Sequence, residues 1–428
     1  MIAIRPGQPL SGTVTVDGSK NAALPLLAAA AVLRQPVQLS NVPANDDVQA
    51  MLMLLQHAGH GVARQVGEPH TVLVRPADGM HIAPEFHVTA ARIRASYYLV
   101  PALLAVHGRA VLPWPGGCRI GERGMEQHFK VYEAFGDRTL VNDHGYSVEA
   151  GGSRTGSVSV MLPFRSRGAS IAAILRAVVA GRPLRLGQPN LSPEVISVVR
   201  ALQASGWETW ADDRVLSVAP PASPPQEPVV WVVPGDKVEA GTLACAIATT
   251  RGNGRIEGVR SKDVAPMVAA LRRLGVPVDA QQNALIVRAE GTRPTRQPLR
   301  AIASLSPGGL DADFEPALMA MTLGMPGTHL FADAINPGRH SNLVPQLARL
   351  GANIHETSPT QCRLTGPQQL TGAGVEATDI RTGSALLIAG LTARGVTTLG
   401  GLEQLRRGHA DLPTKLLALG ADICEVTP

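Results

Sequence analysis

The chain has 428 residues, of which 45% are hydrophobic, 17% are charged and only 3% are aromatic, and its formal net charge is +5. This length exceeds what one ordinary hydrophobic core serves, so we expect two or three domains. The basic balance favours anionic partners. However, the sequence has no run of five or more lysines and arginines, and few aromatic side chains on which bases could stack. We therefore expect small anionic molecules as partners and no nucleic acid.

Hydropathy and cysteine patterns argue against an exported or membrane protein. The longest apolar run, residues 22–33, is much shorter than a membrane span and contains Pro25. The first residues lack the layout of a signal peptide. The cysteines are too widely separated for a disulfide framework or a zinc motif, which favours a reducing cytoplasm and no metal. They are Cys118, Cys245, Cys362 and Cys424.

The chain contains six similar segments in succession. Each has an amphipathic helix that ends at a glycine, followed by a short polar or β-branched stretch. A glycine just past a helix end is the expected residue for a left-handed turn into the next strand. Successive glycines are separated by 77, 70, 69, 76 and 69 residues. They are Gly59, Gly136, Gly206, Gly275, Gly351 and Gly420.

A second helix precedes each amphipathic one and is rich in alanine and other small residues. These helices are apolar nearly all round, so we expect them to be buried within their domains. In chain order they are predicted over residues 21–33, 94–108, 169–181, 239–252, 314–324 and 383–395. Each repeat therefore predicts strands alternating with one buried and one amphipathic helix, which is an α/β arrangement.

The strongest break in composition is APPASPPQEP, residues 219–228, between the third and fourth repeats. Five prolines in ten residues indicate a stiff surface connection rather than a helix or strand. This divides the chain into two halves of three repeats, each with its own core. The alternative is one long α/β domain with a proline-rich loop.

Charged residues gather around the predicted starts of the buried helices. A helix N-terminus has unpaired N–H groups and a partial positive charge, so it attracts anions. If the buried helices of one half run parallel, their N-termini meet at one end, and two such ends would make an electropositive cleft. An acid at a helix start also suits a simple capping role. The residues are Lys20, Arg94, Arg167, Lys237, Asp313 and Arg381.

The stretch PWPGGCRIGER, residues 113–123, places Cys118 on a glycine-rich turn that also carries two arginines. Glycines let the backbone approach a ligand closely, and the neighbouring Arg119 and Arg123 favour a thiolate. Cys118 is therefore a candidate reactive cysteine. The other three cysteines are expected to pack as small hydrophobic residues.

The segments DGSKNAALPLLAAA, RASYYLVPALLA, PGGCRIGER and TDIRTGSALLIAGL, in this order, resemble the enolpyruvyl transferases, and most of all those that act on UDP-N-acetylglucosamine. The resemblance runs through essentially the whole chain. It implies an α/β fold of two inverse α/β barrel domains, each built from three βαβαββ repeats. One domain would comprise residues 1–19 and 229–428, and the other would comprise residues 20–228 with the Cys118 loop.

The resemblance also implies a reaction. The enolpyruvyl group of phosphoenolpyruvate would pass to the 3-hydroxyl of UDP-N-acetylglucosamine with release of phosphate, in the first committed step of peptidoglycan synthesis. No metal or organic cofactor is implied. The chemistry needs a proton donor to the enol carbon, a base for the hydroxyl, and cations for the phosphate and carboxylate.

Site residues follow from the resemblance, position by position. Cys118 matches the cysteine that donates the proton and is alkylated by the epoxide antibiotic fosfomycin. Asp313 matches the base for the hydroxyl, with Asp311 as a rival by simple counting. The other catalytic positions are Lys20, Arg407 and Asp379. The residues expected to bind substrate are Asn21, Arg94, Arg123, Arg167, Lys237, Arg339 and Arg381.

Departures from the family pattern concern the acceptor. Residues 124–127 read Gly-Met-Glu-Gln where the family usually has Pro-x-Asp-Leu beside the uracil. Phe164 stands at the expected position of a lysine that helps to bind the diphosphate, although Arg165 and Arg167 could supply charge. Two alternatives therefore stay open. One is transfer to a different nucleotide or sugar hydroxyl, and the other is a non-catalytic binding protein of the same fold.

Overall fold

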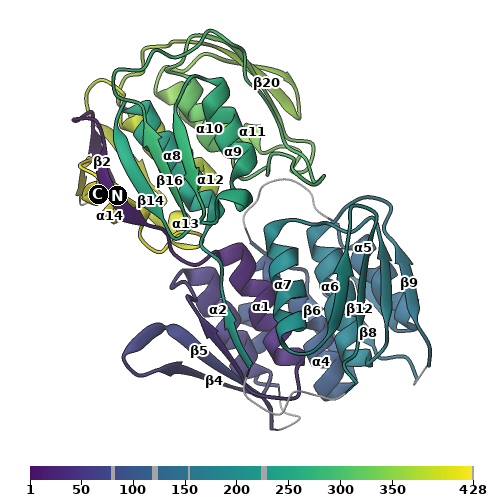
Figure 1. Cartoon of the computed structure of the whole chain (residues 1–428). Helices are drawn as coiled ribbons and strands as arrows, with labels where there is room; N and C mark the ends of the chain where they lie inside the picture. Colours follow the sequence, from purple (N-terminus) through teal and green to yellow (C-terminus); the bar gives the residue numbers. More distant parts are fainter. Residues whose placement is uncertain (79–81, 118–123, 153–154, 223–228, 427–428) are drawn as a thin grey trace. The chain divides into compact units, whose positions relative to one another are not determined.

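The computed structural model describes residues 1–78, 82–117, 124–152, 155–222 and 229–426 (Figure 1). The described chain divides into two compact units. The first unit contains residues 1–17 and the chain from residue 235 onward, and the second contains residues 18–117 and 124–234. Each unit has its own hydrophobic core, with no buried residue shared between the two core clusters.

The boundaries between the units differ from the predicted ones. The strand β13 (Val229–Val232) pairs in parallel with β3 (Val37–Ser40), so it belongs to the second unit. The chain therefore changes unit after Asp17 and after Pro234, rather than after residues 19 and 228. On each side of these two crossings, a backbone hydrogen bond joins the two crossing segments. In the first unit the Asp236 N–H donates to the Asp17 carbonyl, and in the second unit the Ser19 N–H donates to the Pro234 carbonyl.

Three buried helices pack against one another at the centre of each unit. Their alanine and other small side chains let the helices approach closely. In the second unit they are α1 (Lys20–Val32), α4 (Val100–His107) and α6 (Arg167–Ala180). In the first unit they are α8 (Lys237–Thr249), α10 (Glu315–Thr322) and α12 (Ile380–Gly390). The prediction of buried, small-residue helices is confirmed.

One predicted helix is interrupted. Residues 94–108 form a 3₁₀ helix, η1 (Arg94–Leu99), followed by α4. Pro101 lies in the first turn of α4, where its missing N–H costs nothing, and it prevents the preceding turn from continuing as a regular α-helix. Arg94 therefore stands at the start of the 3₁₀ segment rather than of an α-helix.

The amphipathic helices also form as predicted. Each of the six repeat glycines has φ between +85° and +98°, the left-handed conformation expected just past a helix end. The helices are α2 (Asp46–His57), α5 (Glu126–Phe135), α7 (Pro193–Ala204), α9 (Ala265–Arg273), α11 (His340–Arg349) and α14 (Leu412–Ala418). Shorter elements are α3 (Phe86–Ala90), η2 (Ser261–Asp263) and α13 (Leu402–Arg406).

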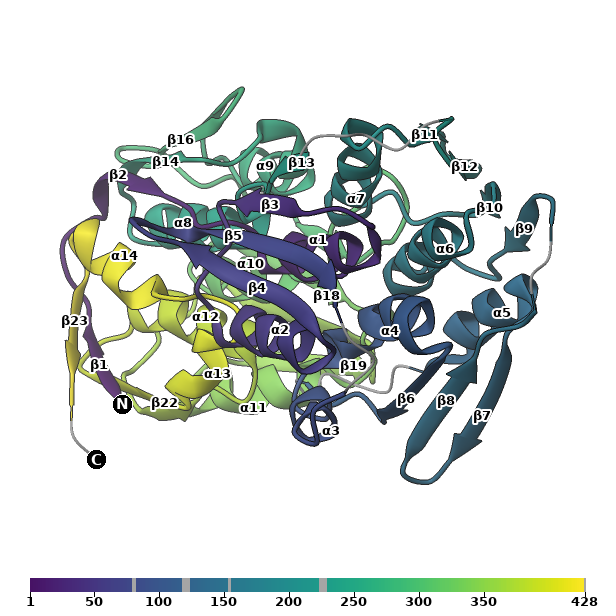
Figure 2. The same cartoon turned by 90° about the horizontal axis from the view of Figure 1, so that it is seen from below.

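The second unit has three separate sheets, with strand orders β13-β3-β5-β4, β6-β8-β7 and β11-β12-β10-β9. Figure 2 shows the antiparallel sheet of β6, β8 and β7 at one edge of this unit. The remaining strands are β4 (His60–Gln65), β5 (Glu68–Ala77), β6 (Arg109–Pro113), β7 (Arg138–Asn142), β8 (Gly145–Glu149), β9 (Val158–Met161), β10 (Leu184–Gly187), β11 (Glu208–Ala211) and β12 (Val215–Ala219).

The first unit also has three sheets, with orders β21-β22-β1-β23, β15-β16-β14-β2 and β17-β18-β20-β19. β1 lies between β22 and β23, as Figure 2 shows, so the two chain ends share one sheet. The strands are β1 (Ile2–Arg5), β2 (Ser11–Thr15), β14 (Asn253–Glu257), β15 (Val278–Gln281), β16 (Ala284–Arg288), β17 (Arg300–Ile302), β18 (Gly327–Ala332), β19 (Ile354–Ser358), β20 (Gln361–Gly366), β21 (Gly374–Glu376), β22 (Thr397–Gly400) and β23 (Asp422–Glu425).

Five of the six sheets have the same topology. One pair of strands is parallel, and the next two strands add to it antiparallel. A buried helix connects the parallel strands within the repeats that are continuous in sequence, as α6 connects β9 to β10. The α/β class and the six repeats are thus confirmed. The described strands form separate sheets rather than a closed barrel, because neighbouring sheets share no ladder.

A search of the described residues finds no helix with the length and hydropathy needed to cross a membrane.

A buried ion pair stabilises the second unit and gives a direct test of its packing. Arg176 on α6 donates two hydrogen bonds of 2.7 Å to the Asp137 carboxylate. Asp137→Ala would leave the guanidinium buried without its carboxylate, and we expect it to lower the free energy of unfolding by about 3–5 kcal/mol. Chemical denaturation followed by circular dichroism measures this loss.

The matched control is the exposed pair of Arg5 and Asp422, whose charged atoms are 3.4 Å apart. Asp422→Ala should have a much smaller effect on stability, because water screens exposed charges. Equal losses in the two variants would contradict the role assigned to the Asp137 pair.

Candidate active site

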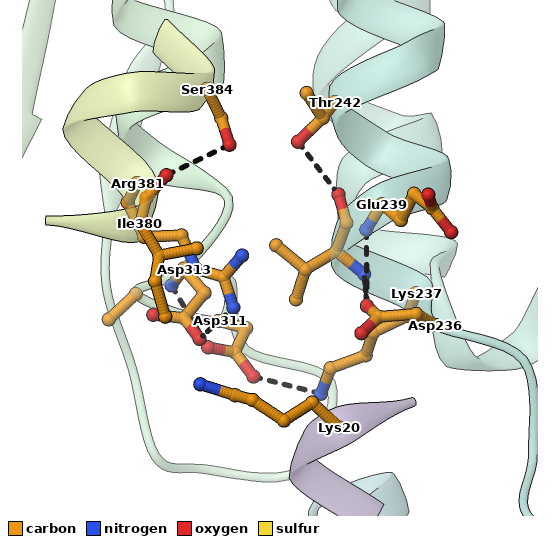
Figure 3. Close-up of polar contacts among 12 residues, drawn as sticks. Lys20, Asp236, Lys237, Glu239, Thr242, Asp311, Asp313, Ile380, Arg381 and Ser384 are labelled. Carbon is orange, nitrogen blue, oxygen red and sulfur yellow. Dashed lines mark hydrogen bonds and ion pairs between the residues drawn. The ribbon is translucent and has the colours of Figure 1, made fainter. Parts of the chain in front are cut away.

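The N-terminal ends of the three buried helices of the first unit meet around one loop. This loop precedes α10 and carries Asp311 and Asp313. The Asp311 carboxylate contacts the Lys237 ammonium on α8 at 2.8 Å, and the Asp313 carboxylate contacts Arg381 on α12 at 3.1 Å (Figure 3). The contacts of this acidic loop therefore show that the N-termini of α8, α10 and α12 lie at the same end of the unit.

Asp313 is held between two guanidinium groups. Its Oδ1 accepts a hydrogen bond from Arg339 and its Oδ2 accepts one from Arg381, both at 3.1 Å. Its side chain is 18% exposed, whereas the two arginines are nearly buried. The carboxylate is thus fixed in orientation at a site that solutes can still reach.

Arg339 is the more deeply buried of the two arginines, with 2% of its side chain exposed. It also donates to the Ala312 carbonyl and lies 3.4 Å from the Asp333 carboxylate. Burial disfavours its charge, but the carboxylates of Asp313 and Asp333 outweigh that cost and raise the pKa of Arg339. It therefore remains a permanent cation behind Asp313.

Asp311 has a different environment from its rival Asp313. Its Oδ1 accepts a hydrogen bond from the Asp313 N–H at 3.0 Å, while its Oδ2 pairs with Lys237. The contacts of Asp311 thus shape the loop and neutralise Lys237. The Asp313 carboxylate instead contacts Arg339 and Arg381, two arginines that were expected to bind substrate. This difference favours Asp313 as the reactive carboxylate.

Asp379 is the N-cap of α12. Its carboxylate accepts hydrogen bonds from the N–H groups of Arg381 and Thr382, at 2.9 and 3.0 Å, and from the Thr382 hydroxyl at 2.6 Å. The side chain is almost fully buried. These contacts fit the capping interpretation of an acid at a helix start, and they place Asp379 as a support for Arg381. Arg407 is half-buried just after α13.

Two residues of this cluster were missed from the sequence. The His409 Nε2 lies 3.1 Å from a guanidinium nitrogen of Arg381, and Asp333 contacts Arg339. His409 follows Arg407 closely in LRRGHADL, so its proximity to another site residue was a usable signal. Asp333 follows β18 and shows no pattern in the sequence that distinguishes it from a turn residue.

In the second unit, Lys20 begins α1 and Asn21 lies in its first turn. The Lys20 ammonium is 3.4 Å from the carboxylate of Asp47 on α2, and both side chains are 11% exposed. A buried lysine at a helix N-terminus is repelled by the helix dipole, and Asp47 offsets this repulsion. An anionic ligand would offset it further.

Arg94 lies beside the start of the glycine-rich loop. A Cβ atom on Gly116 would be 1.9 Å from the Ala91 carbonyl oxygen, so only glycine fits there. Gly117 has φ +105° and packs against Arg94, while the Arg94 guanidinium lies 5.9 Å from the centre of the Tyr97 ring. Cys118 and Arg123 follow and lie outside the described residues.

The third buried helix of this unit begins with Arg167, whose Nε is 3.5 Å from the carboxylate of the buried Glu194. Arg165 donates to the carbonyl groups of Pro189 and Asp213 at 2.7 and 2.6 Å, so its guanidinium is held by the protein itself. Phe164 is 60% exposed. Of the two arginines that could replace the expected lysine, Arg165 is thus bound to two carbonyl groups, and Arg167 is paired with Glu194 while 25% of its side chain stays exposed.

Glu239 lies in the first turn of α8 and is buried. Its two carboxylate oxygens accept hydrogen bonds of 2.8 Å from the Lys415 ammonium and from the Asp17 N–H. Lys415 also pairs with the Asp17 carboxylate at 2.9 Å. Burial raises the pKa of Glu239 to about 7, and the charge of Lys415 only partly opposes this effect. Glu239 and Lys415 thus hold Asp17, the last residue of the N-terminal segment 1–17 of the first unit.

The family is shown by comparison. The model of the EPSP synthase family (3-phosphoshikimate 1-carboxyvinyltransferase) matches residues 4–416. The chain belongs to this family. It is 36% identical to UDP-N-acetylglucosamine 1-carboxyvinyltransferase 3 of Symbiobacterium thermophilum, over 99% of this chain and 97% of that protein. It is 34% identical to UDP-N-acetylglucosamine 1-carboxyvinyltransferase 1 of Staphylococcus aureus, over 99% and 98% of the two chains.

Solved structures of the family agree with the fold. The enolpyruvyl transferase NikO from Streptomyces tendae superposes with a TM-score of 0.85 at 26% identity, covering 100% of this chain and 99% of that one. EPSP synthase from Acinetobacter baumannii superposes with a TM-score of 0.78 over the full length of both chains, but at 18% identity this likeness concerns the fold alone. The protein is thus a transferase of the enolpyruvyl transferase fold.

The raised pKa of Glu239 predicts a pH dependence of stability. Between about pH 4.5 and pH 7, the Glu239 carboxyl keeps its proton in the folded protein. In the unfolded chain the same carboxyl has a pKa of about 4.5 and has released the proton. The contribution of this group to folding is therefore complete below about pH 4.5 and is lost as the pH rises to about 7. Glu239→Gln should flatten that slope when the midpoint of urea unfolding is measured across this range.

Glu403→Gln, at an exposed glutamate of the same unit, is the control and should leave the slope unchanged. An unaltered slope in Glu239→Gln would show that the Glu239 carboxyl does not titrate in this window.

Proposed function

We propose that this protein transfers the enolpyruvyl group of phosphoenolpyruvate to the 3-hydroxyl of UDP-N-acetylglucosamine and releases phosphate. The observation that carries the proposal is the end-to-end likeness to the UDP-N-acetylglucosamine 1-carboxyvinyltransferases. The geometry of Asp313 between Arg339 and Arg381 supports it, because the reaction needs one fixed carboxylate and several cations.

The residues divide the chemistry between them in this proposal. Asp313 accepts the proton of the acceptor hydroxyl, and its two arginine partners keep it ionised and oriented. Cys118 delivers a proton to the enol carbon, which makes the adjacent carbon electrophilic toward the hydroxyl oxygen. Loss of the phosphate and of a proton from the resulting tetrahedral intermediate then yields the enolpyruvyl ether.

The cationic residues would bind the two anionic groups of phosphoenolpyruvate. Guanidinium groups match the planar carboxylate and the phosphate with paired hydrogen bonds. Lys237 is neutralised by Asp311 in the structure, so its proposed part is to hold the loop that carries Asp313. The other residues proposed to bind substrate, or to clamp it during the reaction, are Lys20, Asn21, Arg94, Arg123, Arg167, Arg381 and Arg407.

The acceptor side differs from the pattern expected for a nucleotide diphosphate. Phe164 is exposed, and Arg165 is bound to two carbonyl groups, so the diphosphate would rely on Arg167 and on the N-terminus of α6. The widely spaced cysteines fit a cytoplasmic setting for this reaction.

An acceptor screen tests the function. Purified protein with phosphoenolpyruvate is expected to release phosphate only when UDP-N-acetylglucosamine is added, as measured by a colorimetric phosphate assay, and the enolpyruvyl product is detected by mass spectrometry. UMP, UDP, free N-acetylglucosamine and shikimate 3-phosphate are tested in parallel. Activity with one of these and none with UDP-N-acetylglucosamine would replace the proposed acceptor. No turnover with any, but binding of phosphoenolpyruvate, would indicate a non-catalytic protein.

The identity of the base is tested by a matched pair of variants. Asp313→Asn keeps the size of the side chain but removes the proton acceptor, so kcat is expected to fall about 10²–10⁴-fold. Asp311→Asn should have a much smaller effect on kcat and should act mainly through the Asp311–Lys237 pair. A larger loss of kcat in Asp311→Asn would assign the base to Asp311.

A further inference from the structure

A second group of reactive side chains lies in the first unit and has no part in the proposed reaction. It consists of Glu315 in the first turn of α10, His340 in the first turn of α11, and Cys362 on β20. The carboxylate, imidazole and thiol atoms that could bind a metal all lie within 4.8 Å of one another. Three separate elements thus bring together three different kinds of donor atom.

All three side chains are removed from water. Glu315 and Cys362 have no exposed surface, and His340 is 1% exposed. All three side chains have a charged protonation state, which burial makes costly unless another charge compensates it. Hydrophobic packing explains the burial of Cys362 alone, since Glu315 and His340 are polar.

The internal contacts of the group do not use all its polar atoms. The His340 Nε2 and the Glu315 Oε1 are 2.8 Å apart and share one hydrogen bond. The second carboxylate oxygen, Oε2, and the second imidazole nitrogen, Nδ1, are buried without a hydrogen-bond partner among the described residues. A buried polar atom left in this state destabilises the fold. The hydrogen-bonded pair alone therefore does not account for the arrangement.

We propose that Glu315, His340 and Cys362 form a binding site for one divalent transition-metal ion, with zinc as the best match. Zinc accepts carboxylate oxygen, imidazole nitrogen and thiolate sulfur together, and its tetrahedral ligand atoms lie about 3–4 Å apart. One carboxylate, one thiolate and a neutral imidazole bring two negative charges, which balance the ion. Three protein ligands leave one coordination position for a water molecule or another small donor.

The position of the site gives it a structural role. His340 follows Arg339 directly, and Glu315 comes two residues after Asp313. An ion bound there would join the starts of α10 and α11 to β20, next to the point where Arg339 contacts Asp313. The proposed ion stabilises this corner of the unit and takes no part in the transfer of the enolpyruvyl group.

Metal analysis of the full-length protein tests the site directly. Protein produced in zinc-supplemented medium and dialysed without chelator is expected to retain about one zinc ion per chain by elemental mass spectrometry. Protein unfolded with chelator and refolded with Co²⁺ is expected to show a near-ultraviolet charge-transfer band from thiolate to cobalt. Neither readout depends on catalytic activity.

Two cysteine variants make the test specific. Cys362→Ser should abolish the charge-transfer band and the retained zinc. Cys245→Ser is the matched control, because Cys245 is equally buried in the first unit but lies outside the cluster, and it should keep both. His340→Gln should weaken zinc retention while the thiolate band in refolded protein diminishes.

A stability measurement covers the case in which a variant folds poorly. Zinc should raise the unfolding temperature of the wild-type protein relative to chelator-treated protein, because a ligand that binds only the folded state stabilises it. Absence of both retained metal and a cobalt band in folded wild-type protein would overturn the proposal and leave the Glu315–His340 hydrogen bond as a purely internal pair. A cobalt band that persists in Cys362→Ser would overturn it equally.

Discussion

The packing of three small-residue helices against one another is the constraint on which each unit depends. The helices α8, α10 and α12 are buried on all sides, so a charged side chain beyond their first turns would lie in the apolar core. Their N-terminal turns are the exception, since unpaired N–H groups require polar partners there. Charge is therefore concentrated at one end of the helix trio, and the fold itself produces a polar site on an apolar core.

The charged residues at that end depend on one another. Asp313 would be a costly half-buried carboxylate without Arg339 and Arg381, and the two arginines would repel each other without Asp313. The Asp379 cap and the Asp311–Lys237 pair hold the surrounding backbone in place. The carboxylate that we propose as the base is thus held by arginines that remain charged.

Sequence reasoning succeeded where a local rule repeats. The six glycines were predictable because each one follows a helix end that demands a left-handed residue, and the buried helices were predictable from their apolar composition. It failed where the outcome depends on contacts between distant segments. The pairing of β13 with β3 moved a domain boundary, and nothing near residue 229 signals it. The inverse α/β barrel came from the resemblance rather than from a local rule. This fold class is confirmed, and the described strands of each unit form separate sheets.

The candidate site shows the same division. Lys20, Arg167 and Lys237 were found at helix starts, as their positions in the sequence indicated. The contact of His409 with Arg381, and the meeting of Glu315, His340 and Cys362, depend on tertiary packing between residues 22 to 47 positions apart. No local spacing rule predicts these contacts, although the closeness of His409 to Arg407 in the sequence was a signal that His409 lies near the site. For Cys362 the default interpretation as a small hydrophobic residue considered only its own segment.

The place of β1 in the sheet with β22 and β23 has a consequence for synthesis of the protein. The ribosome makes residues 2–5 long before it makes their partners at residues 397–400 and 422–425. The second unit is complete once β13 has been made, so it can fold while the chain is still growing. The first unit cannot complete the sheet of β1, β22 and β23 until residues 422–425 have been made, and β1 has neither of these partners before residues 397–400 are made.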